Sequence, residues 1–322
     1  MSDTALARTE VTMDLLKETN FTFLGRKITG KVRDIYEQDD RLILITTDRH
    51  SSFDRIIAHI PWKGQVLNQV SAHWFEATRD IVPNHVLAVP DPNVTVAKKC
   101  TMVPVEAVVR GYLTGVTDTA IWTRYGKGER NFGGVALPDS MRKNQQLPQP
   151  IFDPTTKEAA HDRTLTAEQM IAEGFVSKEM FERIRRTALA LFTRGQELAA
   201  RNGLILVDTK YEFGTDANGA LVLIDEIHTP DSSRYWQRES YGPRFASGEE
   251  PQYFDKEFLR LWFRDHSDPY ADAALPEAPA ELVAELSRRY IQMYEQITGG
   301  KFAYGETPVL PRIERNLKPY RV

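Results

Sequence analysis

The spacing of apolar residues predicts strands in the first third of the chain and helices later. Residues 41–47 form a β-branched, apolar run between charged turn residues, which is typical of a strand. Residues 64–79 carry apolar positions at helical spacing and predict a helix. Residues 103–109 predict a strand at a sheet edge or with a bulge, because Pro104 cannot donate a ladder hydrogen bond.

The pattern then changes to a long irregular stretch followed by helices. Residues 124–165 are rich in Gly, Asn, Gln and Pro, so they predict a loop. Helix resumes at residues 166–169, which have the form of a capping box, and a longer helix over 177–201 ends at Asn202-Gly203. Residues 279–299 predict an amphipathic helix. Strand blocks and helices without regular βαβ units indicate the α+β fold class.

A hairpin after residue 203 carries the first candidate chemistry. Residues 204–207 are expected to pair with 221–224 across the turn sequence GTDANG. Asp208, Lys210 and Glu212 alternate, so they share one face of the strand.

A turn centred on GTDANG would place Asp208 opposite Asp225, with Cβ atoms about 5 Å apart. Two opposed carboxylates repel, and a bridging Mg²⁺ would relieve the repulsion because it prefers oxygen ligands. Two alternatives stay open: Lys210 pairs with a carboxylate in an ordinary ion-pair ladder, or the register slips by one residue.

A glycine turn near the start of the chain is a second candidate. Residues 25–32 nearly match a P-loop, but Val32 replaces the magnesium-binding hydroxyl and a strand follows where a P-loop needs a helix. The turn itself, at Gly30 and flanked by Lys31 and Arg33, suits close approach to a ligand. The two cations alternate along the strand and are expected on one face, either to bind polyphosphate or as a basic surface hairpin.

Other cations suggest a second anion site. Arg234 follows two serines in a polar loop, and an arginine binds phosphate or carboxylate bidentately. Arg110 ends a strand before a glycine turn, and Lys256 and Arg260 are one helical turn apart. The basic run at the end of the chain, Arg312, Arg315, Lys318 and Arg321, is expected to be a solvated end. We assign no proton-transfer role to His50 or His228, because isolated histidines in polar loops more often form hydrogen bonds or are simply exposed.

Composition narrows the class of protein. The chain has 322 residues, a net charge of −4 and one cysteine. No global field therefore favours nucleic acid or an anionic membrane, and no internal disulfide forms. No apolar run approaches the ~20 residues that span a bilayer, and the first residues lack a signal or transit pattern. We expect a cytoplasmic protein with no nucleic-acid or membrane partner.

Taken together, the segments GKVRDIY, TTDRHSSFD, VPVEAVVRGYLTG, KNQQLPQPIFDPTTK, LILVDTKYEFG, LIDEIHTPDSSRYW and DKEFLRLWF resemble the SAICAR synthetase family in its longer single-function form. They occur in order between about residues 24 and 300. The resemblance implies a strand-rich nucleotide lobe similar to a kinase N-lobe or ATP-grasp module, a larger α+β lobe and C-terminal helices. We place these at residues 1–108, 109–265 and 266–322.

The resemblance also implies site residues. The ATP set is Gly30, Lys31, Arg33, Lys99, Met102 and Glu106. The catalytic set is Lys210, Asp208 and Asp225, with both aspartates holding Mg²⁺. The substrate set is Ser51, Asp54, Arg110, Thr117, Asp231, Ser233, Arg234, Lys256 and Arg260. Val116 stands where the family commonly has a phosphate-binding serine, and Thr117 is the substitute.

The implied reaction is an ATP-dependent ligation of L-aspartate to a carboxyaminoimidazole ribonucleotide, through an acyl phosphate, in purine biosynthesis. The alternatives are another small-molecule phosphotransferase and a non-catalytic nucleotide sensor. The protein-kinase motifs HRD and DFG are absent, which disfavours a kinase. For the longer form of the family we favour a monomer, while residues 124–165 as a mobile lid stay an open question.

Overall fold

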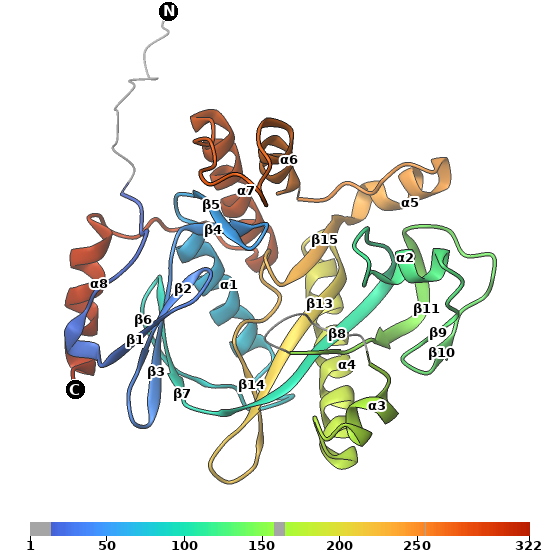
Figure 1. Ribbon diagram of the computed structural model, residues 1–322, viewed down its shortest axis with the longest axis horizontal. Coiled ribbons are helices and arrows are strands. Elements are labelled where there is room, and N and C mark those ends of the chain that lie inside the picture. Colours follow the sequence, from blue (N-terminus) through green and yellow to red (C-terminus); the bar gives the residue numbers. More distant parts are fainter. Residues whose placement is uncertain (1–13, 158–164, 255) are drawn as a thin grey trace, which may run out of the picture.

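The computed structural model describes residues 14–157, 165–254 and 256–322, which form two large antiparallel sheets and two two-stranded ones with helices around them (Figure 1). This arrangement confirms the α+β class. Residues 1–13 of the expected nucleotide lobe and 158–164 of the expected loop lie outside the described residues.

The first sheet is built from the N-terminal third of the chain. Its strand order is β1 (Arg26–Thr29), β2 (Arg33–Glu37), β3 (Arg41–Thr46), β7 (Val94–Lys98) and β6 (Val86–Asp91). The apolar run that predicted a strand is β3, whose Ile43 and Ile45 are fully buried. A separate hairpin, β4 (Arg49–Ser52) and β5 (Arg55–His59), follows the third strand.

The second sheet runs through the middle of the molecule (Figure 1). Its order is β11 (Gln145–Phe152), β8 (Thr101–Leu113), β13 (Leu204–Thr215) and β14 (Leu221–Ile224), with β12 (Thr155–Thr156) beside β8 and β15 (Ser233–Gln237) beside β13. Both β8 and β13 are interior strands, and they deliver polar side chains toward the site.

Helices cover the sheets and build the main core. They are α1 (Lys63–Ala77), α2 (Ile121–Gly126), α3 (Ala167–Ala172), α4 (Lys178–Arg201), α5 (Arg238–Ser247), α6 (Glu257–His266), α7 (Ala280–Thr298) and α8 (Val309–Leu317). Trp74 of α1, Phe192 of α4, Phe213 of β13 and Tyr290 of α7 share one core. The predicted helices at 64–79, 177–201 and 279–299 are thus confirmed, as is the capping box of Thr166 and Gln169.

The end of the chain returns to the first sheet. Val309, Ile313 and Leu317 of α8 pack in one buried cluster with strands β2, β3 and β7. The expectation of a solvated basic end is wrong for Arg312, which is only 4% exposed and is bound to Asp91 and Asn93. An amphipathic helix explains this, because Arg312 lies beside Ile313 on the inward side.

For the strand predicted at 103–109 the bulge is confirmed and the sheet edge is wrong, and the loop predicted over 124–165 is wrong in part. Strand β8 is no edge strand, although Pro104 does lie at a bulge, between the pairs Glu106↔Glu212 and Met102↔Gly214. The long stretch predicted as loop contains α2, the strands β9 (Asn131–Phe132) and β10 (Val135–Ala136), and the paired strands β11 and β12. The prolines in β11 are tolerated because the ladder with β8 is interrupted between Gln146 and Ile151.

The register predicted for the hairpin is also wrong. Strand β14 pairs with the far end of β13, with Phe213 opposite Leu223, whereas residues 204–206 pair with β15. The carboxylate of Asp216 accepts hydrogen bonds from the amides of Asn218 and Ala220, which centres the turn further along the chain. Asp208 therefore lies between Arg110 and Arg234, and does not face Asp225.

Candidate active site

A cleft with a volume of about 880 Å³ opens beside strands β13 and β15. The expected substrate residues that line it are Ser51, Thr117, Asp231, Ser233, Arg234, Lys256 and Arg260, joined by Asp208. They come from β4, the loop after β8, β13, the loop before β15, β15 itself, and the start of α6. Residues spread over more than 200 positions of sequence thus converge on one cavity.

One end of this cleft is formed by Arg234 and the glycine turn after β8. The Arg234 Nε atom lies 3.8 Å from Asp208, and its Nη1 atom lies 3.5 Å from the Thr114 hydroxyl. Gly115 has a φ of 102°, and an added Cβ would lie 2.6 Å from the Cβ of Ala120, so the turn requires glycine. The Thr114 hydroxyl and the Arg234 guanidinium beside this tight turn suit a phosphate monoester.

Arg110 lies behind this turn instead of in the cleft. Its side chain is bonded to Asp153 at 2.6 Å and to the Thr119 carbonyl at 3.2 Å. This arginine therefore fixes the loop that carries Thr117.

The other end of the cleft carries Lys256 and Arg260. The Lys256 ammonium bonds to the Pro230 carbonyl at 2.9 Å and to Asp231 at 3.2 Å. The Arg260 guanidinium lies 4.8 Å from the ring centre of Phe53 and 3.2 Å from Glu257. Asp54, at the tip of the β4–β5 hairpin, instead contacts Lys31 at 2.8 Å.

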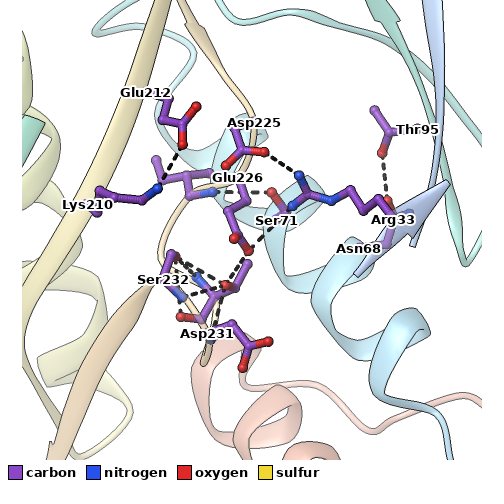
Figure 2. A network of polar contacts seen from close by, with 12 residues as sticks. Arg33, Asn68, Ser71, Thr95, Lys210, Glu212, Asp225, Glu226, Asp231 and Ser232 are labelled. Atoms are coloured by element: carbon purple, nitrogen blue, oxygen red, sulfur yellow. Dashed lines mark hydrogen bonds and ion pairs between the residues drawn. The ribbon is translucent and has the colours of Figure 1, made fainter. Parts of the chain in front are cut away.

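A network of charges joins the two sheets (Figure 2). Arg33 of β2 donates to Asp225, which follows β14, and lies 3.6 Å from Glu226. Burial alone would lower the pKa of Arg33, but these carboxylates raise it above its ordinary value. Burial raises the pKa of Glu226 above its ordinary value. In Asp225 burial acts in the same direction, but Arg33 and Lys210 outweigh it and lower the pKa. Asp225 is thus an anion at neutral pH.

Lys210 occupies the middle of β13 among carboxylates. Its ammonium bonds to Glu106 at 2.7 Å and to Glu212 at 2.8 Å, and Glu212 also accepts from Lys157. Burial would lower the pKa of Lys210, but Glu212 and Glu106 raise it above its ordinary value. Lys210 is a fixed positive charge, held in the ion-pair ladder that the sequence left open as an alternative.

The expected ATP residues lie along the first sheet and the start of β8. The Gly30 amide donates to the Arg33 carbonyl at 2.8 Å, which closes the turn between β1 and β2. Lys31 lies in that turn and is exposed, so the expectation that Lys31 and Arg33 share a strand face is wrong. Lys99 bonds to Glu37 at 2.8 Å, and Met102 is 45% exposed.

Sequence reasoning missed several participants. Glu212 was recognisable, since it alternates with Asp208 and Lys210. Glu226 stands next to Asp225, yet nothing in the sequence shows that Arg33 reaches both. Lys63 is the first residue of α1, and Tyr290 is a buried residue within α7. Both fit ordinary helical patterns, so the sequence did not mark them as site residues.

A cleft that carries Arg234, Lys256 and Arg260, beside a buried lysine–carboxylate network, is typical of a protein that binds anionic small molecules. The sequence model of the SAICAR synthetase family matches residues 26–276. The chain belongs to the SAICAR synthetase family. This confirms the resemblance seen in the sequence, and with it the class of enzyme, a ligase of purine biosynthesis.

Relatives support this membership over nearly the whole chain. A phosphoribosylaminoimidazole-succinocarboxamide synthase of Legionella pneumophila (strain Lens) is 56% identical over 305 residues, covering 94% of this chain and 97% of the relative. A chloroplastic synthase of Arabidopsis thaliana is 53% identical over 307 residues, covering 94% of this chain and 75% of the relative.

Solved structures share the fold. The SAICAR synthase of Saccharomyces cerevisiae in complex with SAICAR has a TM-score of 0.76 at 30% identity, covering 90% of this chain and all (100%) of that one. A type-2 SAICAR synthetase in complex with ADP has a TM-score of 0.65 at 26% identity, with 87% and 100% covered. In the described part of this chain, no helix has the length and apolarity to cross a membrane.

Proposed function

We propose that the chain joins L-aspartate to the carboxylate of a carboxyaminoimidazole ribonucleotide through an amide bond, with ATP converted to ADP and phosphate. The observation that carries this proposal is the convergence of the expected substrate residues on one cleft, within a chain of the SAICAR synthetase family. The relatives solved with SAICAR and with ADP support the two halves of the substrate set.

The reaction needs activation of a carboxylate, because its charge repels an amine and it lacks a leaving group. Transfer of the terminal phosphoryl group of ATP to the carboxylate gives an acyl phosphate. The aspartate amine then attacks the acyl carbon, the bond to phosphate breaks, and the amine loses a proton. Phosphoryl transfer depends mainly on positioning and charge neutralisation, which Arg33 and Lys210 supply as fixed cations.

The nucleotide is assigned to the first sheet and the start of β8. In this proposal the turn at Gly30 and Lys31 covers the phosphates, while Lys99, Met102 and Glu106 receive adenine and ribose. The 45% exposure of Met102 supports this, since a ligand can reach this residue from the surface. Arg234, Ser233 and Thr117 then bind the ribonucleotide phosphate, and Ser51 lines the same cleft. Asp54 stays an expected substrate residue, although it contacts Lys31 and does not line the cleft.

Magnesium fits the chemistry of the donor set. Mg²⁺ takes oxygen ligands and is held by one or two carboxylates together with substrate phosphates. Asp225 supplies an ionised carboxylate beside Glu226, and no cluster of three or more metal-binding side chains is found among the described residues. We propose Asp225 as a ligand; Asp208, its expected partner, is not placed opposite it by the register of β13. The ion, when bound, would neutralise the transferring phosphoryl group.

We further propose the monomeric state, the cytoplasmic location and the three-part division of the chain as expected from the sequence. The boundary between residues 108 and 109 falls inside β8, which contributes to both the nucleotide and the substrate sides. The C-terminal part divides its contacts, because α7 packs in the main core and α8 on the first sheet.

The test is ADP release with ATP, Mg²⁺, the ribonucleotide and L-aspartate, each omitted in turn. We expect sustained ADP release and the succinocarboxamide product only when all four are present. Sustained ADP release without the ribonucleotide would contradict the proposal and indicate another phosphoryl acceptor; a single turnover without aspartate would not, because the acyl phosphate forms before the amine attacks.

Asp225→Asn should lower kcat by about a hundredfold or more, because it removes an anion proposed to hold the metal. The fold should persist, since Asp225 has a φ of 67° and asparagine tolerates that conformation. Asp40→Asn, at an exposed turn aspartate paired with Arg41, is the matched control. Near-normal magnesium-dependent turnover of Asp225→Asn would exclude its role as a metal ligand.

A further inference from the structure

Lys63 is a fully buried lysine at the first turn of α1. Its side chain is 0% exposed, and its ammonium bonds to Asp231 at 2.7 Å. The same ammonium lies 5.4 Å from the ring centre of Tyr290 in α7. Burial of a lysine charge is costly and is tolerated here because Asp231 pairs with it. Packing alone therefore does not explain why a lysine occupies this position.

Asp231 collects donors from three separate parts of the chain. Besides Lys63, the Tyr290 hydroxyl donates to it at 2.6 Å and the Lys256 ammonium at 3.2 Å. The Asp231 carboxylate is nevertheless 22% exposed, and Asp231, Lys256 and Tyr290 all line the cleft. The carboxylate is therefore held by three donors and is still partly exposed where it lines the cleft.

We propose that Lys63 and Tyr290 are positioning residues, which hold Asp231 as an ionised acceptor for an N–H or O–H group of a substrate in the cleft. The inference rests on the proposed function and deepens it. Neither residue touches the substrate in this scheme, and both act through Asp231. The donor is an amine or hydroxyl of the ribonucleotide, or the amine of aspartate.

The charges around Asp231 suit a hydrogen-bond acceptor better than a general base. Burial would raise the pKa of Asp231, but Lys63 and Lys256 outweigh it and hold the pKa well below its ordinary value. A carboxylate with so low a pKa removes a proton poorly but accepts a strong hydrogen bond. The titratable or charged groups around it are Lys63 of α1, His50 of β4, Lys256 at the start of α6, Tyr290 of α7 and Glu226 of the same loop.

The test measures KM for each substrate, kcat and the pH profile of kcat/KM in Tyr290→Phe and Lys63→Met. We expect KM to rise about tenfold for the substrate that Asp231 contacts, with a smaller change in kcat. Which KM rises identifies the ribonucleotide or aspartate as the donor. The acidic limb of the profile should move to higher pH, since Asp231 loses a group that keeps it ionised.

A double-mutant cycle separates this role from a structural one. If Lys63 acts through Asp231, then Lys63→Met should add little to the defect of Asp231→Asn. Additive effects, or an unchanged KM and acidic limb in Tyr290→Phe, would overturn the proposal. Tyr290→Phe decides the matter if Lys63→Met does not fold, because it removes one hydroxyl only.

Two comparisons complete the design. Tyr125→Phe removes another buried hydroxyl, bonded to the Pro138 carbonyl, and should leave KM and the pH profile unchanged. Turnover of the unaltered protein in the same assay tests the proposed function itself. Failure there is therefore distinguishable from failure of the positioning role.

Discussion

Histidines in the interior of this protein are held neutral. Burial lowers the pKa of His50 to about 3, of His85 to about 4 and of His228 to about 3. The Nε2 atom of His85 has no hydrogen-bond partner within the described parts of the chain. The folded protein therefore holds these histidines in their neutral form, and its stability depends on pH.

The direction of that dependence follows from proton uptake. Below about pH 6.5 the unfolded chain protonates its histidines while the folded protein does not, so stability falls as pH decreases toward the folded pKa. For His85, whose folded pKa is about 4, the loss at pH 5 is about 2 kcal/mol.

His85→Leu should remove this part of the pH dependence. Urea unfolding at pH 7.5 and pH 5 is the measurement, and the free energy of unfolding of the variant should fall less between them, by about 2 kcal/mol. Comparing each protein with itself cancels any change in packing at pH 7.5. Parallel pH profiles would show that His85 becomes protonated in the folded state.

At the residue scale, the sequence indicated those functional side chains whose identifying neighbours lie close to them along the chain. Asp208, Lys210 and Asp225 stand out because they follow the apolar runs 204–207 and 221–224 in the sequence. The partner Glu106 of Lys210 could not be inferred, since it is 104 positions away and reaches Lys210 only through the pairing of β8 with β13. Burial of Lys63 depends in the same way on α7.

At the scale of elements, α1 is seated on the first sheet through a glycine. An added Cβ at Gly64 would lie 2.3 Å from the Thr46 carbonyl oxygen at the end of β3. The Asp48 carboxylate accepts from the Gly64 amide at 3.0 Å, which fixes the start of the helix. The close approach of helix to strand also orients Lys63.

Gly64→Ala should lower the free energy of unfolding by about 1–3 kcal/mol, because the helix must move away from β3. Gly126→Ala is the matched control, since it is also a helical glycine and has nothing within 4 Å of an added Cβ. Chemical denaturation of both variants is the measurement. Equal stability of the two would mean that the Gly64 backbone relaxes freely.

Elements with a clear period were predictable, whereas register and sheet order were not. The predicted helices match α1, α4 and α7, because each combines spacing with a stop signal. The β13–β14 register failed because the side chain of Asp216 moves the centre of the turn. Strand β11 was predicted as loop because its prolines suggested a break, which a local interruption of the ladder accommodates.

At the scale of the whole molecule, helix α8 closes the first sheet. The Arg312 guanidinium bonds to Asp91 at 2.9 and 3.1 Å and to Asn93 at 2.7 Å, all in the interior. Asn316 donates to the same aspartate at 2.8 Å. Residues more than 200 positions apart are joined by a buried ion pair.

Arg312→Met should destabilise the protein by about 3–5 kcal/mol, because it leaves Asp91 buried without its cation. Arg315→Met is the control on the same helix, since Arg315 and Glu306 form an exposed pair, and should cost less than about 1 kcal/mol. Thermal unfolding of both variants is the measurement. A loss in Arg312→Met no larger than the control would show that solvent reaches Asp91.

The return of α8 to the first sheet also sets an order of events during synthesis. Strands β2, β3 and β7 leave the ribosome within the first 98 residues, but the helix that covers their apolar face begins at Val309. Nascent chains usually complete their N-terminal domains first, at roughly 5–20 residues per second. Here the earliest-made sheet must wait for most of translation, roughly ten seconds or more, with Ile43 and Ile45 uncovered. During that interval the growing chain presents an aggregation-prone surface that holdase chaperones recognise.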